Sequence, residues 1–147
     1  MLKIMVDDSF LKALIFEDHP KHTIASKMAE AIDDTEYLFI PCYVLNHVFD
    51  DIGNNPSQES KKFFDNICCS TRNIRLMSRE SQKLAYEIFE SHPPLSYEES
   101  FTVALMQIND MRHIISFNEK YDNVKEIKRL YDVDEYSMKR LNYIIYE

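Results

Sequence analysis

The sequence predicts an α/β protein, a three-layer α/β/α sandwich around a parallel sheet of four or five strands. Short apolar runs typical of strands alternate with helix-length segments along the whole chain. Strands that are joined through helices pair in parallel and bury both faces of their sheet under helices. The length of 147 residues suits one domain, so we expect a single domain over residues 1–147.

The first expected strand ends on two carboxylates. Residues 3–6 form an apolar run of strand type, and Asp7 and Asp8 follow it directly. Ligand sites in α/β folds collect at the carboxyl ends of parallel strands, so the pair predicts a Mg²⁺ or phosphoryl site. The alternative is that one of the two residues only caps the helix that starts near Phe10.

Two helices and a second strand follow. Apolar residues at helical spacing predict a helix over 9–16. Pro20 suits the first turn of a helix, which predicts a second helix over 20–33. The apolar run YLFIP predicts a strand over 37–41.

The middle of the chain continues the same alternation. A helix over 43–52 would end at Gly53, the only glycine of the chain. A further helix is expected over 57–69, followed by a strand over 73–77 and an amphipathic helix over 79–91.

The last third adds one helix and two strands. Ser96 and Glu99 form an S-x-x-E capping box that predicts a helix over 96–109. Strands are expected over 113–117 and, shorter, over 126–130. The remaining stretch, about 134–146, fits either a helix or a strand, in a C-terminal extension (132–147) packed on the domain.

Composition excludes several functions. A net charge of −8 argues against binding nucleic acid through a broad basic face. Local contact remains open through a set of bases or through bridging metal ions, and the alternative is that these bases form a solvated surface. The set is Lys120, Lys125, Lys128 and Arg129.

Other classes are excluded by missing motifs. One glycine is too few for a P-loop or a dinucleotide fingerprint, in which glycines let the backbone approach phosphate. Neither a signal peptide nor a membrane-spanning apolar run is found, so we expect a cytoplasmic protein without a membrane partner. The three cysteines, Cys42, Cys68 and Cys69, do not have the spacing of a disulfide or zinc framework.

Four segments together resemble the PIN domain, the fold of many Mg²⁺- or Mn²⁺-dependent ribonucleases, including toxins of toxin–antitoxin pairs. They match that family in order and spacing. The segments are KIMVDDSFLKALI (3–15), HPKHTIASKMAEAI (19–32), IPCYVLNHVFDDI (40–52) and PLSYEESFTVALM (94–106) with HIISFNEKYDNVKEIKRL (113–130).

The resemblance implies an acidic active site that this chain keeps only in part. Asp7 stands at the family's first metal-binding Asp, and Glu99 stands where the family has a further Asp. His47 replaces the usual Glu, and Asn118 replaces the Asp that follows the last strand of the family pattern. Asp122 matches a less strictly used acid. These five positions are the expected catalytic residues, and Asp7, Glu99 and Asp122 would hold one Mg²⁺ or Mn²⁺.

Each departure also has a reading without metal chemistry. His47 would be a helix residue near the mouth of the pocket, and Asn118 a turn residue. Glu99 would act as the capping-box residue, a role compatible with metal binding. The chain is therefore either a divergent endoribonuclease with weakened or lost activity, or a non-catalytic PIN-like binding or scaffold module.

The expected partners follow from the same resemblance and from composition. RNA and a small antitoxin-like protein are the partners that the family implies. The chain also has nine Tyr, nine Phe and seven Met, and such residues are enriched at interface cores. We therefore expect a symmetric homodimer.

Overall fold

The sheet has five parallel strands in the computed structural model, which describes residues 3–31, 37–53, 57, 58, 60–62, 65, 72–74 and 79–132. The strands are β1 (Lys3–Val6), β2 (Tyr37–Pro41), β3 (Arg72–Ile74), β4 (His113–Ile115) and β5 (Lys128–Leu130). Their order across the sheet is β3-β2-β1-β4-β5, and every neighbouring pair is parallel. The predicted α/β fold with a parallel sheet is confirmed.

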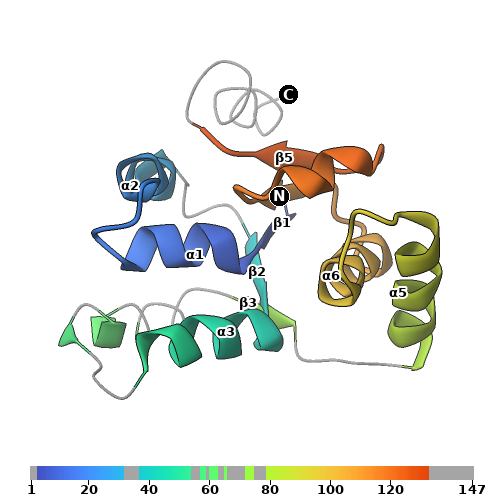
Figure 1. Ribbon diagram of the computed structural model, residues 1–147, viewed down its shortest axis with the longest axis horizontal. Coiled ribbons are helices and arrows are strands. Elements are labelled where there is room, and N and C mark those ends of the chain that lie inside the picture. Colours follow the sequence, from blue (N-terminus) through green and yellow to red (C-terminus); the bar gives the residue numbers. More distant parts are fainter. Residues whose placement is uncertain are drawn as a thin grey trace.

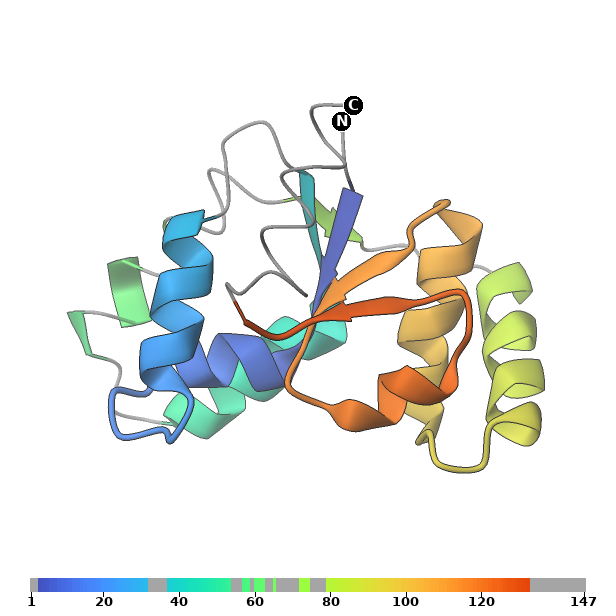
Figure 2. The ribbon, with the colours of Figure 1, turned by 90° about the horizontal axis from the view of Figure 1, so that it is seen from above.

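Helices cover both faces of this sheet and complete the three layers (Figure 1 and Figure 2). One face carries α1 (Asp8–Ile15), α2 (His22–Ala31) and α3 (Cys42–Ile52), and the other carries α5 (Arg79–Ser91) and α6 (Tyr97–Ile108). A short 3₁₀ helix, η1 (Glu119–Asn123), lies between β4 and β5.

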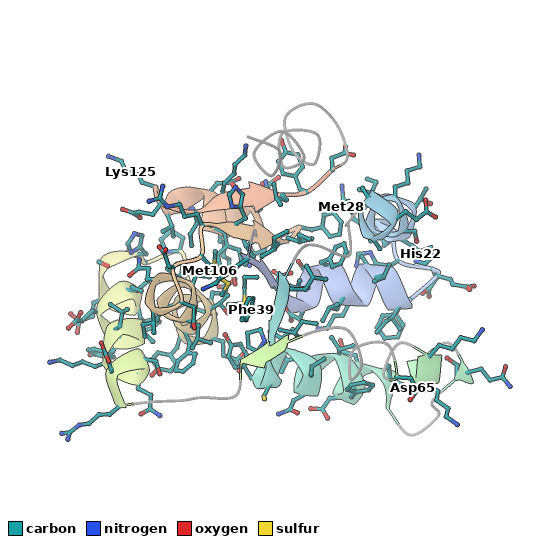
Figure 3. The ribbon with its side chains drawn as sticks, turned by 180° about the vertical axis from the view of Figure 1, so that it is seen from behind. His22, Met28, Phe39, Asp65, Met106 and Lys125 are labelled. Atoms are coloured by element: carbon teal, nitrogen blue, oxygen red, sulfur yellow. The ribbon has the colours of Figure 1, made fainter. Side chains whose placement is uncertain are left out.

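Each layer of helices packs on its own core. Ile4 and Val6 of β1 belong to the core under α1, α2 and α3, whereas Met5 belongs to the core under α5 and α6. This division follows from the pleat, because successive side chains of a strand point to opposite faces. Met28 of α2 and Met106 of α6 are fully buried, one in each core (Figure 3).

Element boundaries agree with the sequence prediction to within two residues. The helix expected over 20–33 begins at His22, so Pro20 precedes α2 instead of standing in its first turn, and the strand expected over 126–130 begins at Lys128. The helix expected over 79–91 has those bounds, and Ser96 and Glu99 form the predicted capping box of α6. The strand expected over 113–117 ends at Ile115. Beyond it the N–H groups of Phe117 and Asn118 donate to the Ser9 and Ser116 hydroxyls instead of continuing a sheet ladder.

Some predictions fall outside the described residues. These are most of the helix expected over 57–69, the end of the strand expected over 73–77 and the whole stretch 134–146. Among the residues that the structure describes, no helix has the length and apolar character needed to cross a membrane.

Candidate functional site

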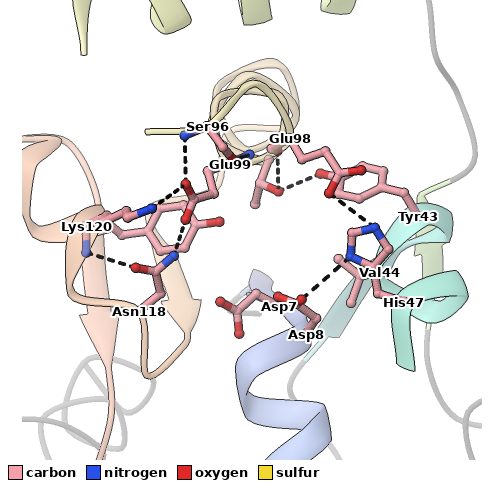
Figure 4. Close-up of a pocket in the computed structure, with 12 residues that line it drawn as sticks. Asp7, Asp8, Tyr43, Val44, His47, Ser96, Glu98, Glu99, Asn118 and Lys120 are labelled. Atoms are coloured by element: carbon pink, nitrogen blue, oxygen red, sulfur yellow. Dashed lines mark hydrogen bonds and ion pairs between the residues drawn. The ribbon is translucent and has the colours of Figure 1, made fainter. Parts of the chain in front are cut away.

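A cavity of about 300 Å³ opens at the carboxyl edge of the sheet (Figure 4). The strand order reverses direction at β1, since β2 and β3 are added on one side and β4 and β5 on the other. Ligands of open parallel sheets bind at such a switch point. Asp7, His47, Glu99 and Asn118, from four separate segments of the chain, all line this cavity.

Asp7 lies at the bottom of the site, directly after β1. Its Oδ1 accepts hydrogen bonds from the Ser9 hydroxyl (2.7 Å) and from the Phe10 N–H (3.2 Å), so Asp7 is also the N-cap of α1. Its Oδ2 accepts a hydrogen bond from the Ser116 hydroxyl. The capping role expected from the sequence is therefore confirmed, and the same carboxylate faces the cavity.

Burial controls the protonation of Asp7. The side chain is only 3% exposed. Burial raises its pKa to about 6, although the hydrogen bonds from Ser116, Ser9 and the Phe10 N–H act in the opposite direction. An ordinary surface Asp is fully ionised at neutral pH, whereas a fraction of Asp7 still carries a proton there.

Two serines that the sequence analysis did not single out hold this carboxylate in place. Ser9 accepts the Phe117 N–H (2.9 Å) and Ser116 accepts the Asn118 N–H (2.9 Å) while both donate to Asp7. The two hydroxyls thereby tie the end of β1 to the end of β4. The signal that could have revealed Ser9 is its place directly after the acidic pair, whereas Ser116 falls inside the strand expected over 113–117 and enters the site only because β4 ends at Ile115.

Glu99 lies in the first turn of α6 and is held by donors from three residues. Its Oε1 accepts the Ser96 N–H at 2.7 Å and lies 3.4 Å from the Lys120 Nζ, and its Oε2 accepts a hydrogen bond from the Asn118 amide. Burial raises the pKa of Glu99, but the bonds from Ser96 and Asn118 and the charge of Lys120 outweigh it. The pKa therefore lies below its ordinary value.

The Asn118 side chain is oriented by donors and acceptors on both of its ends. Its Oδ1 accepts the Lys120 N–H at 3.1 Å, which caps η1, and its Nδ2 donates to Glu99. A backbone N–H can only donate and a carboxylate can only accept, so the amide has one consistent orientation. Asn118 thus presents nitrogen to Glu99, where the aspartate of the family pattern would present another anion.

His47 bridges two further acids at the mouth of the cavity. Its Nδ1 lies 3.6 Å from Asp8 and its Nε2 lies 3.2 Å from Glu98 (Figure 4). Asp8 is also 3.5 Å from Lys12. Because both ring nitrogens face carboxylates, His47 acts here as a link between α1, α3 and α6.

Asp122 is the one expected site residue that is not among those lining the cavity. Its two oxygens lie 3.0 Å from Nε and Nη2 of Arg129. Arg129 also donates to the Ser116 carbonyl (3.2 Å) and stacks over Tyr131. The expectation that Asp122 shares an ion with Asp7 and Glu99 does not match this placement, because the carboxylate is directed to a guanidinium.

Two tyrosines, which the sequence analysis also missed, border the cavity. Tyr43 exchanges a hydrogen bond with Thr102 at 2.5 Å, and Tyr121 is almost completely buried. Burial raises the pKa of both phenols above the ordinary value, so both are neutral. Both tyrosines lie inside segments that resemble the family, Tyr43 in 40–52 and Tyr121 in 113–130, but the sequence analysis did not assign them to the site.

The donor set suits a hard cation only in part. Asp7 and Glu99 supply the carboxylate oxygens that Mg²⁺ and Mn²⁺ accept. Within the described part of the chain, however, no group of three or more His, Cys, Asp or Glu side chains is arranged to hold a metal ion. A cation would therefore depend on Asp7 and Glu99, with water completing its coordination.

Known structures with the same fold are toxins and toxin–antitoxin complexes. VapC20 of Mycobacterium tuberculosis, a toxin that cleaves the sarcin–ricin loop, has 16% identity and a TM-score of 0.69, over 83% of this chain and 95% of VapC20. A toxin–antitoxin complex from Klebsiella pneumoniae has 12% identity and a TM-score of 0.66, over 88% and 98% of the two chains. VapBC2 of Rickettsia felis, bound to a DNA fragment from its promoter, has 11% identity and a TM-score of 0.66, over 87% and 97%.

Sequence comparison adds no relative, since no protein-family model and no curated protein matches the chain. The structural likeness covers most of this chain and nearly all of each neighbour. Together with the sheet order and the acidic cavity at its carboxyl edge, this likeness shows that the chain has the PIN-like fold predicted from its sequence.

Proposed function

We propose that this chain is a divergent metal-dependent endoribonuclease whose hydrolytic activity is weakened. The observation that carries the proposal is the cavity itself, in which Asp7, Glu99 and Asn118 meet although they are far apart in the sequence. The fold shared with VapC20, a sarcin–ricin loop cleaving toxin by its description, supports a nuclease function.

Asp7 and Glu99 are the residues that would hold the Mg²⁺ or Mn²⁺. A divalent ion bound there supplies an activated water and stabilises the charge that develops on phosphorus. Ser9 and Ser116 keep the Asp7 carboxylate fixed, and Ser96 does the same for Glu99. Asp122 is left out of this set because Arg129 holds it.

Weakened activity follows from the two substituted positions. His47 and Asn118 remove two anions from a pocket whose charge attracts the cation. The ion should therefore bind less tightly than in a site with four acids.

A second candidate function is a non-catalytic binding module. The observation that favours it is that both oxygens of Glu99 already accept hydrogen bonds from residues of the chain. A cation must compete with these donors. The two functions make opposite predictions for metal binding and cleavage.

Calorimetry with Mn²⁺ and a fluorogenic single-stranded RNA assay separate the two functions. The proteins compared are the wild type, Asp7→Asn, and the double variant His47→Glu with Asn118→Asp. We expect measurable Mn²⁺ binding and slow Mn²⁺-dependent cleavage by the wild type. Asp7→Asn should abolish both, and the double variant should raise Mg²⁺ affinity because two anions return to the pocket.

Asp110→Asn is the matched control for Asp7→Asn, since Asp110 is exposed and is not among the cavity-lining residues. This control should bind Mn²⁺ and cleave RNA as the wild type does. A wild type that neither binds Mn²⁺ nor cleaves RNA would overturn the nuclease proposal and favour the binding module.

The proposed partners are a small antitoxin-like protein and a second copy of the chain. The structural neighbour from Klebsiella pneumoniae is a toxin–antitoxin complex by its description, which supports the first. Exposed aromatic side chains support the second copy of the chain as a partner. The ring centroids of Tyr86 and Phe89 lie 6.4 Å apart and those of Phe89 and Tyr97 5.9 Å apart, so the three rings form a row across α5 and α6. Light scattering that gives a 17.5 kDa monomer at tens of micromolar would remove the dimer proposal.

A further inference from the structure

Lys120 brings a positive charge into a cavity otherwise lined by acids. Among the described residues that line the cavity, it is the only lysine or arginine, whereas Asp7, Asp8, Glu98 and Glu99 all carry carboxylates. Its ammonium lies 3.4 Å from Glu99, and about half of the Lys120 side chain is exposed. The charge is therefore inside the site and still open to a ligand.

The backbone of η1 fixes the position from which the Lys120 side chain extends. The Lys120 N–H donates to Asn118, and the amide of Asn118 donates to the same Glu99 that the Lys120 ammonium approaches. One short turn thus delivers two donors to a single carboxylate (Figure 4). With aspartate in place of Asn118, that turn would bring an anion next to Glu99, and the two anions would favour binding of a cation from solution.

The two acids at the mouth of the cavity, Asp8 and Glu98, also have basic side chains of the protein close to them. Asp8 is near Lys12 and His47, and Glu98 is near His47. Asp7, by contrast, has only neutral donors among the residues that the structure describes. Within that part of the chain, an external cation would meet no competing cationic side chain at Asp7, whereas at Glu99 it would meet Lys120.

We infer that Lys120 is a tethered cation that competes with the divalent ion for Glu99 and that contacts a phosphate of bound RNA once the ion takes this carboxylate. The inference deepens the proposed function, because it concerns the same cavity. A lysine suits this exchange, since its ammonium is a compact charge on a flexible stem of four carbons. A phosphodiester is the matching ligand, because an acidic cavity repels phosphate unless a cation lies between them.

The test compares Lys120→Met, Lys120→Arg and Lys125→Met with the wild type. Lys120→Met removes the competing charge, and Lys120→Arg keeps it. Lys125→Met changes the net charge equally at an exposed residue outside the cavity (Figure 3). Mn²⁺ affinity is measured by calorimetry, and RNA affinity by fluorescence anisotropy with a labelled single-stranded 2′-O-methyl oligoribonucleotide in Mn²⁺.

Lys120→Met should bind Mn²⁺ about fivefold more tightly than the wild type and bind the oligonucleotide about fivefold more weakly. Lys120→Arg and Lys125→Met should stay within about twofold of the wild type in both measurements. A lysine with a purely structural role would not produce changes of opposite sign.

Unchanged or weaker Mn²⁺ binding by Lys120→Met overturns the competition with the ion, and unchanged oligonucleotide binding overturns the contact with phosphate. Mn²⁺ binding that appears only in Lys120→Met supports the inference even where the wild type cleaves no RNA. Failure of the proposed nuclease function is read separately, from the cleavage assay on the wild type and Asp7→Asn.

Discussion

Asp7 and Glu99 line the same cavity and are held in opposite ways. Asp7 is buried and accepts only neutral donors, namely two hydroxyls and one backbone N–H. Glu99 is partly exposed and has an ammonium near it in addition to its neutral donors. The pKa of Asp7 is raised to about 6, whereas that of Glu99 is lowered.

The contrast shows that the surroundings, more than the type of side chain, decide what a carboxylate can do. Asp7 holds a charge that its own chain does not neutralise, so a cation from solution would relieve it. Glu99 has its charge balanced from within the protein, so an external cation gains less there. We therefore expect Asp7 to contribute more to metal affinity than Glu99 does.

The largest expected effect is on the free energy of unfolding, whose pH dependence should differ between the wild type and Asp7→Asn. The pKa of Asp7 is raised on folding, from 3.8 to about 6, so the folded protein binds a proton more tightly than the unfolded chain. Wild-type stability should therefore fall as pH rises from below about 4 to above about 6, by about 3 kcal/mol in all. Asn at this position carries no charge, so the stability of Asp7→Asn should not show this fall with rising pH.

Urea denaturation of both proteins at several pH values between 4 and 8 measures this difference. Asp7→Asn should gain about 2 kcal/mol on the wild type between pH 4 and pH 8, whatever its stability at pH 4. A difference that stays constant over this range would show that burial does not control the protonation of Asp7.

Ser116→Ala should have the next largest effect, because it breaks the contacts that hold Asp7. The fully buried hydroxyl donates to Asp7 and accepts the Asn118 N–H. We expect a loss of about 2 kcal/mol in the free energy of unfolding at pH 7. Ser91→Ala is the control, since Ser91 is exposed and its hydroxyl bonds only to carbonyls of its own helix and to the adjacent His92, and it should change stability by less than about 0.5 kcal/mol.

The fold could be predicted from sequence because its signals are local. Apolar runs, the Ser96–Glu99 capping box and the helix-length segments between strands depend only on neighbouring residues. The convergence of Asp7, Glu99 and Asn118 also follows once the strands are parallel, since their carboxyl ends share one edge.

The hydrogen bonds within the site could not be predicted in the same way. Ser116 reaches Asp7 across 109 positions of sequence, and Lys120 reaches Glu99 across 21. Whether Asn118 presents oxygen or nitrogen depends on a backbone N–H whose direction is set by η1. Asp122 matched the family pattern in sequence, and only the folded chain reveals its pairing with Arg129.

Arg129→Lys should lower the free energy of unfolding by less than Ser116→Ala does. The planar guanidinium contacts both oxygens of Asp122 and the Ser116 carbonyl, a pattern that an ammonium cannot reproduce. We expect a loss of about 1 kcal/mol by thermal or urea denaturation. A loss below about 0.3 kcal/mol would mean that the Asp122 pair adds nothing to the turn.

The smallest effect expected is that of Glu99→Gln, and its pH dependence has the opposite sign to that of Asp7→Asn. The pKa of Glu99 is lowered on folding, so its charge stabilises the protein at neutral pH. The variant should lose about 0.5–1 kcal/mol at pH 7, and the difference should shrink as pH falls below the ordinary range of a glutamate. An equal loss at pH 3 and pH 7 would assign the effect to the capping box alone.

The most direct test of the central claim is a crystal structure of the wild type soaked in Mn²⁺, with anomalous data collected near the manganese edge. The account predicts one anomalous peak in the cavity, within about 2.5 Å of a carboxylate oxygen of Asp7. The same crystals of Asp7→Asn should lack the peak. A cavity without manganese in the wild type, or a peak that persists in Asp7→Asn, would contradict the account.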